Sequence, residues 1–111
     1  MTVIVYHNPR CSKSRATLAL LKDYGIEPDI IEYLQTPQNA DTLLEIAKKL
    51  NQPLQALLRA HDSEDDVSGL DDAGLAQYLI ENPKLIQRPI VVVDDRARIG
   101  RPPESILEIL P

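Results

Sequence analysis

The sequence has 111 residues and a mass of 12.4 kDa, which is the size of one ordinary domain. Hydrophobic residues make up 43% and charged residues 26%, a globular composition that excludes disordered and collagen-like proteins. The net charge of −5 and the pI near 4.9 argue against binding to nucleic acid or to an anionic membrane surface. The longest apolar runs are far too short to span a bilayer.

The first third of the chain predicts a strand–helix–strand unit. Residues 2–6 are apolar and β-branched, which is typical of a buried strand. A helix is predicted next, from residues that recur at helical spacing: Thr17, Leu20, Leu21 and Tyr24. Gly25 is suited to end that helix, and residues 28–33 predict a second strand. Two strands joined through a helix are expected to pair in parallel.

The middle of the chain is predicted to be a helical insertion at about 38–83. Asn39 is suited to cap a helix whose inward stripe has helical spacing. That stripe consists of Leu43, Ile46, Ala47 and Leu50. Asp72 is predicted to cap a later helix that ends before Pro83. Residues 62–72 hold six carboxylates and predict a solvated loop.

The last third of the chain returns to strands. Residues 89–93 predict a central strand, because consecutive apolar residues need cover on both faces of a sheet. Asp94 and Asp95 predict a turn, and Arg96–Ile99 predicts a shorter strand that pairs antiparallel with the one before it. Pro103 is suited to begin a final helix.

This order of elements predicts an α/β, thioredoxin-like fold. It runs βαβ, then the helical insertion, then ββα. We expect a single domain over residues 1–111, built on a four-stranded mixed sheet, with the insertion at about 38–83.

The single cysteine, Cys11, is predicted to be a reactive thiol. It falls in a polar turn between the first strand and the first helix, where helix amides and the helix dipole favour an anion. Arg10, Lys13 and Arg15 add positive charge beside it. A buried, inert cysteine is the usual alternative, but these polar neighbours argue against burial.

One cysteine cannot form an internal disulfide, so any thiol chemistry needs a second thiol from outside the chain. The N-terminus lacks the charged and apolar regions of a signal peptide. We therefore expect a cytoplasmic protein, and we expect it to be a monomer.

Ser14 occupies the position at which a thioredoxin-type CxxC motif would carry its second cysteine. Its hydroxyl can donate a hydrogen bond to a thiolate or an oxyanion, or it can cap the helix. Arg15 comes too early for the C-x5-R loop of tyrosine-phosphatase-like proteins, which excludes that fold.

Three arginines stand out by their positions. Arg59 follows a short predicted helix, Arg88 precedes the central strand, and Arg101 follows the last strand. In thioredoxin-like folds a proline before the third strand is typically cis and faces the active cysteine, so the Arg88–Pro89 bond is predicted to be cis. Each arginine alone would be explained as a surface residue. Together they predict a fork-shaped, permanently charged clamp for a tetrahedral oxyanion.

These motifs resemble the glutaredoxin-dependent arsenate reductase family. The resemblance lies in HNPxCxxSR at 7–15, EYLxTP at 32–37, ALLR at 56–59, RPIV at 88–91 and RP at 101–102, where x is any residue. It covers essentially the whole chain.

The resemblance implies a thioredoxin-like fold with Cys11 as the nucleophile. It implies that arsenate, or a similar oxyanion, is bound by Arg59, Arg88 and Arg101. It also implies supporting roles near the thiol for His7 and Ser14. Glutathione and glutaredoxin would act as external reductants and partners, with no bound cofactor and no metal.

Two other functions remain open. One is a glutathione-dependent thiol oxidoreductase that acts on another substrate, with the arginines binding the carboxylates of glutathione. The other is a non-catalytic regulator resembling the Spx-type proteins that bind RNA polymerase; their redox switch uses two cysteines, which Ser14 precludes here. A metal site at His61 and Asp62 is disfavoured relative to a solvated loop, because no regular ligand spacing is present.

Overall fold

The computed structural model describes residues 2–63 and 65–110, and the chain forms two units. The first unit combines residues 1–36 with residues 88–111, and the second comprises residues 37–87. The helices of the insertion predicted at about 38–83 lie in the second unit. That the two units together make a single domain stays a prediction.

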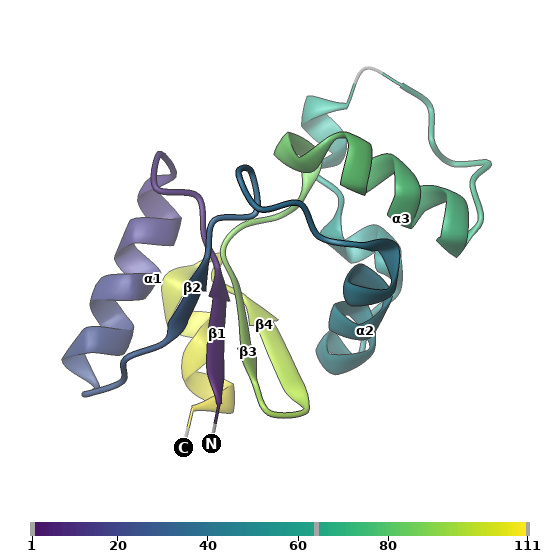
Figure 1. Ribbon diagram of the computed structural model, residues 1–111. Coiled ribbons are helices and arrows are strands. Elements are labelled where there is room, and N and C mark those ends of the chain that lie inside the picture. The colour runs from purple at the N-terminus through teal and green to yellow at the C-terminus, as the bar shows by residue number, and fades with distance from the viewer. Residues whose placement is uncertain (1, 64, 111) are drawn as a thin grey trace. The chain divides into compact units, whose positions relative to one another are not determined.

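The first unit is built on a four-stranded mixed sheet, as predicted (Figure 1). Its strands are β1 (Val3–Tyr6), β2 (Asp29–Ile31), β3 (Ile90–Val93) and β4 (Arg96–Ile99), in the order β2-β1-β3-β4. β1 and β2 pair in parallel, whereas β3 pairs antiparallel with both β1 and β4. The central position of β3 explains its composition, because all four of its residues are buried.

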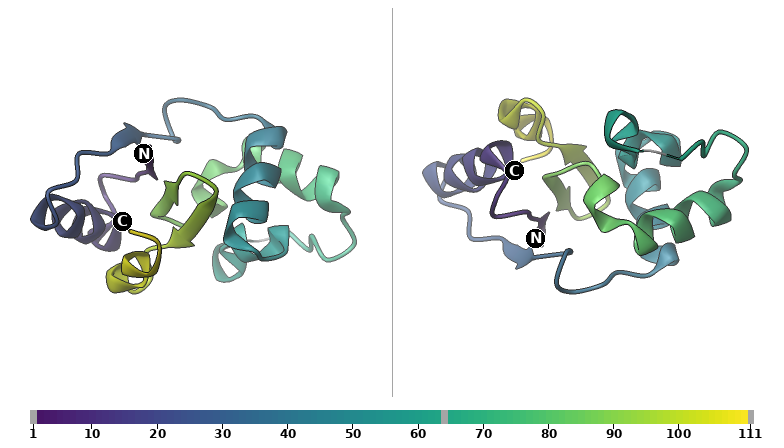
Figure 2. Two further views of the ribbon diagram at one scale, coloured as in Figure 1. Left: turned by 90° about the horizontal axis from the view of Figure 1, so that it is seen from below. Right: turned by 90° about the horizontal axis from the view of Figure 1, so that it is seen from above.

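Two helical segments cover one face of this sheet (Figure 2). They are α1 (Ser12–Asp23) and the C-terminal segment η4 (Pro103–Ile109). Alternate residues of β1 and β3 point toward them, since side chains alternate between the faces of a strand. The resulting aliphatic core contains Val3, Val5, Leu21, Val91, Val93, Ile106 and Ile109.

Some local predictions in this unit need correction. The final helix, predicted to start at Pro103, is a 3-10 helix, although it buries Ile106 and Ile109. Tyr24, one of the residues whose spacing predicted the helix, lies just past the end of α1 and is 58% exposed. Gly25 ends the helix as predicted, with a φ of 74° that favours glycine.

The second unit consists of helices. They are α2 (Ala40–Leu50), α3 (Asp72–Glu81) and the short 3-10 helices η1 (Leu54–Leu57), η2 (Ala60–Asp62) and η3 (Pro83–Leu85). Asn39 caps α2 as predicted, and its side chain accepts the backbone N–H of Thr42 at 2.9 Å. The cap of α3 is Asp71 rather than Asp72, which is already the first helical residue. No helix in the described part of the chain is long and apolar enough to cross a membrane.

Candidate active site

The loop between β1 and α1 places Cys11 at the start of the helix, as predicted. Cys11 is the N-cap residue of α1, with extended backbone angles of φ −90° and ψ 124°. Its N–H donates to the carbonyl of Asn8 at 3.0 Å, and its own carbonyl accepts the N–H of Arg15 at 3.0 Å. The side chain is partly exposed, so the thiol is open to a reactant. This excludes the buried, inert cysteine.

Arg88 lies just before β3, and Arg101 lies just after β4. The Nη1 atom of Arg101 lies 4.0 Å from the Cys11 Sγ and donates to the carbonyl oxygen of Arg88 at 3.2 Å. These two strands pair through Ile90 and Ile99. The structure therefore brings two of the three predicted arginines to the thiol.

The backbone beside these arginines is closely packed. The Arg88–Pro89 bond is cis, as predicted, and the Arg101–Pro102 bond is cis too. Gly100 donates its N–H to the Pro89 carbonyl at 2.9 Å. A Cβ atom on Gly100 would lie 2.6 Å from the Thr17 Oγ1 and 2.7 Å from the Pro89 Cγ, so a glycine lets β4 end this close to α1.

The pKa of the Cys11 thiol is lowered from its ordinary value. Burial acts in the opposite direction and is the largest single influence, but several groups together outweigh it. Hydrogen bonds from the backbone N–H groups of Ser14 and Lys13 favour the thiolate, and so do the hydrogen bond and the charge of Arg88. The site therefore has an activated thiolate within reach of two guanidinium groups.

We expect alkylation of Cys11 by iodoacetamide to reach its full rate below the pH at which a free thiol ionises, about 8.5. Only the thiolate reacts, and Cys11 is the only cysteine, so the rate measured against pH reports its ionisation directly. An inflection at or above the value of a free thiol would contradict the activated site. The urea-unfolded chain is the control, since it lacks the helix amides and Arg88.

His7 and Ser14 form a buried pair under the Cys11 loop. The Nδ1 of His7 and the Oγ of Ser14 are 2.6 Å apart, and Ser14 also accepts the backbone N–H of Asn8 at 3.1 Å. His7 is 7% exposed, and Ser14 is fully buried. The Ser14 hydroxyl thus ties Asn8 of the loop to the first turn of α1, and the Ser14 backbone N–H in that turn favours the Cys11 thiolate. Ser14 does not cap the helix with its side chain, since Cys11 is the cap residue.

The pKa of His7 is lowered from 6.5, first because of burial and then because of the charge of Arg15, while Glu32 opposes the shift. The folded protein thus prefers neutral His7, so the unfolded chain binds more protons at mildly acid pH. We expect the free energy of unfolding to fall as the pH drops below about 6.5. Urea titrations at pH 7.5 and 5.0 measure this loss, and His7→Asn is expected to reduce it. An equal loss in the variant would contradict the assignment to His7.

Arg59 lies in the second unit, where two strand-like segments hold its backbone. Leu58 forms an isolated antiparallel bridge with Ile86, and the N–H of Arg59 donates to the Leu85 carbonyl at 2.7 Å. The Nε of Arg59 forms an ion pair with Asp62 at 2.7 Å. Its predicted role in binding the oxyanion stays a prediction.

Several contacts of the site cannot be derived from residue spacing in the sequence. The contact of Arg101 with the thiol and with the Arg88 carbonyl joins residues 90 and 13 positions apart, which no spacing rule connects. The partnership of Asp62 with Arg59 has the i, i+3 spacing of a helical ion pair, but Asp62 reads as one of six loop carboxylates. Among the side chains that the structure describes, which do not include that of His61, no three of His, Cys, Asp or Glu gather as a group that could hold a metal ion.

A parallel β1–α1–β2 unit, an antiparallel hairpin and a cysteine at the α1 N-terminus define a thioredoxin-like fold with one active-site thiol. Comparison with known proteins gives the family. The model of the ArsC family matches residues 6–109, and the chain belongs to that family.

Three relatives illustrate the similarity. The chain is 47% identical over 114 residues to the Escherichia coli protein YfgD, in an alignment that covers 97% of this chain and 96% of that protein. It is 47% identical over 116 residues to the arsenate reductase of Haemophilus influenzae, with coverage of 99% and 100%. The structure of the arsenate reductase from Vibrio cholerae superposes with a TM-score of 0.91 at 45% identity, over 99% of this chain and 98% of that one.

Proposed function

We propose that this protein reduces arsenate to arsenite, with Cys11 as the nucleophile and with glutathione and glutaredoxin as external reductants. The observation that carries the proposal is the Cys11 thiol, whose pKa is lowered and which lies 4.0 Å from the Arg101 guanidinium. The choice of arsenate as the substrate is supported by relatives, since two proteins that are 47% and 45% identical to this chain are named arsenate reductases. The reductants are those of the reduced thiol pool of the cytoplasm.

In the first step the Cys11 thiolate attacks the arsenic of arsenate. An arsenic–sulfur bond forms and an arsenic–oxygen bond breaks, and the leaving oxygen takes a proton and departs as water. Arsenic remains pentavalent. Arg88 and Arg101 balance the charge of the oxyanion, and a guanidinium offers paired N–H donors that match two oxygens of a tetrahedral anion.

In the second step glutathione displaces a second oxygen as water, so that arsenic carries both sulfurs. A glutaredoxin thiolate then attacks the glutathione sulfur and forms a mixed disulfide with it. The sulfur–arsenic bond breaks, and its electron pair reduces arsenic from the pentavalent to the trivalent state. Water finally displaces Cys11 and releases arsenite. The chain has one cysteine, so the second and third sulfurs must come from outside.

Arg59 is proposed as a third group that binds the oxyanion. Its support is the family motif, ALLR at 56–59. Asp62 already engages the Nε atom, and the guanidinium has four further N–H donors.

The test is arsenite production from arsenate with the complete system and with each reductant left out. We expect turnover only when glutathione and glutaredoxin are both present. Reduction of a small disulfide is measured in parallel. A protein that reduces the disulfide but produces no arsenite would be a thiol oxidoreductase of another kind, and the proposal would be wrong.

A further inference from the structure

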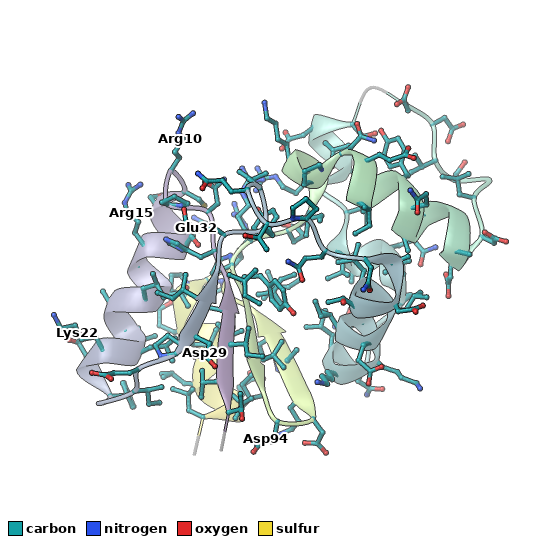
Figure 3. All side chains as sticks on the ribbon, in the orientation of Figure 1. Arg10, Arg15, Lys22, Asp29, Glu32 and Asp94 are labelled. Carbon is teal, nitrogen blue, oxygen red and sulfur yellow. The ribbon has the colours of Figure 1, made fainter. Side chains whose placement is uncertain are left out.

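Three basic residues lie within four positions of Cys11 in the sequence. Arg10, Lys13 and Arg15 are all exposed, and together we call them the basic collar. Figure 3 shows Arg10 and Arg15 at the N-terminal end of α1, pointing away from the sheet. Within the described residues, no ion pair involves any of the three. The collar is therefore a local positive surface on a chain whose net charge is −5.

The main groups that favour the thiolate lie outside the charges of the collar. The groups that lower the pKa of Cys11 are the backbone N–H groups of Ser14 and Lys13 and the side chain of Arg88. The charges of Arg10, of the Lys13 ammonium and of Arg15 are not among them. The side chains of Arg10, Lys13 and Arg15 are exposed, so their charges can act on a reactant that approaches Cys11.

Hydrogen bonds to the loop hold two residues of the collar, Arg15 and Arg10. The Nη1 of Arg15 donates to the Pro9 carbonyl at 2.9 Å, which fixes the guanidinium beside the turn and leaves further N–H donors exposed. Arg10 is anchored through its backbone, whose N–H donates to the Asn8 side chain at 3.0 Å. The loop that carries Cys11 therefore holds the Arg15 guanidinium and the Arg10 backbone in place.

We infer that the basic collar selects an anionic thiol as the reactant that removes adducts from Cys11. This inference rests on the proposed function, because that function requires an external thiol. Apart from its sulfur, glutathione carries two carboxylates and one ammonium group, so it brings one net negative charge to the collar. Opposite charges raise the encounter rate and hold the attacking thiolate near the adduct. A neutral thiol gains nothing there, and a cationic thiol is repelled.

The test needs no arsenate. Cys11 is converted to a mixed disulfide with 2,2′-dithiodipyridine, and a second thiol then displaces the pyridine group. The incoming thiolate attacks the Cys11 sulfur, a new disulfide forms, the old one breaks, and the leaving thiolate takes a proton to become pyridine-2-thione. Its absorbance gives the rate. Glutathione, 2-mercaptoethanol and cysteamine are compared, each corrected for the ionisation of its own thiol.

The variant is the double substitution Arg10→Gln with Lys13→Gln, which removes two exposed charges and keeps the Lys13 backbone N–H. We expect the ratio of the glutathione rate to the cysteamine rate to fall about fivefold at low ionic strength. The rate with 2-mercaptoethanol is expected to stay unchanged. High salt should bring the ratio of the unaltered protein down toward that of the variant.

The control is Lys22→Gln, which removes one charge of the same sign from the last turn of the same helix. Figure 3 shows Lys22 at the opposite end of α1 from Arg10 and Arg15, so the ratio is expected to stay as in the unaltered protein. The inference would be overturned if the double variant kept the ratio of glutathione rate to cysteamine rate of the unaltered protein. It would also be overturned if Lys22→Gln lowered that ratio as much as the double variant does. A protein that shows the expected ratios but makes no arsenite would instead contradict the proposed function alone.

Discussion

Replacing Cys11 with serine is expected to lower arsenite production by about a thousandfold or more, to the rate without protein. A hydroxyl at this position stays protonated at neutral pH, whereas the helix amides and Arg88 favour the thiolate of cysteine. No other sulfur nucleophile is present, because Cys11 is the only cysteine. Arsenite formed from arsenate in the presence of glutathione and glutaredoxin is the measurement.

The control for this variant is a measurement of its folding stability. Serine is nearly isosteric with cysteine, and its hydroxyl can accept the same backbone N–H groups of Lys13 and Ser14, so urea unfolding is expected to change little. Ser12→Ala changes an exposed neighbour at the first position of α1 and should keep most of the activity. Turnover by Cys11→Ser above the background would show that the reaction does not pass through this sulfur.

Replacing Arg88 with lysine is expected to lower kcat/KM for arsenate by about tenfold to a hundredfold. Lysine keeps the positive charge but lacks the planar fork that binds two oxygens at once. It also lacks the guanidinium N–H that favours the Cys11 thiolate, so the rise of activity with pH should move to higher pH. Initial rates across arsenate concentrations and pH measure both effects.

Arg96→Lys is the matched control for this substitution. Arg96 is an exposed residue at the start of β4, whereas Arg88 precedes β3, whose first residue pairs with the last residue of β4. The same chemical change at Arg96 should leave kcat/KM as it is. Equal kcat/KM values for Arg88→Lys and the unaltered protein would remove Arg88 from the site.

The sequence predicts the strands and the cap of α2 well, because these depend on local chemistry. Continuous apolar runs mark β1 and β3, since a central strand needs cover on both faces. Asn39 marks the start of α2, since its short side chain reaches the Thr42 N–H. Local rules fail where two neighbours compete, as at Asp71 and Asp72, because both can cap and only the backbone decides.

The site is harder to predict than the fold. The position of Cys11 follows from local order, because the residue lies directly between a strand and a helix. Its partners do not, since Arg101 reaches the sulfur only once β3 and β4 have paired and Gly100 has allowed close packing against Thr17. The sequence predicts that helix amides and nearby basic residues favour the thiolate, and the backbone N–H groups of Ser14 and Lys13 do so in the structure, together with Arg88.

The buried serine at position 14 has a kinetic consequence. In a CxxC protein the second thiol is tethered beside the first, so its effective concentration is high and independent of the surroundings. Here Ser14 occupies the position of the second thiol, and its side chain is buried and hydrogen-bonded to His7. An adduct on Cys11 can therefore be removed only by a thiol that arrives by diffusion. The lifetime of the adduct then varies inversely with the concentration of that thiol. Depleting the thiol pool would leave the protein stalled with its sulfur occupied.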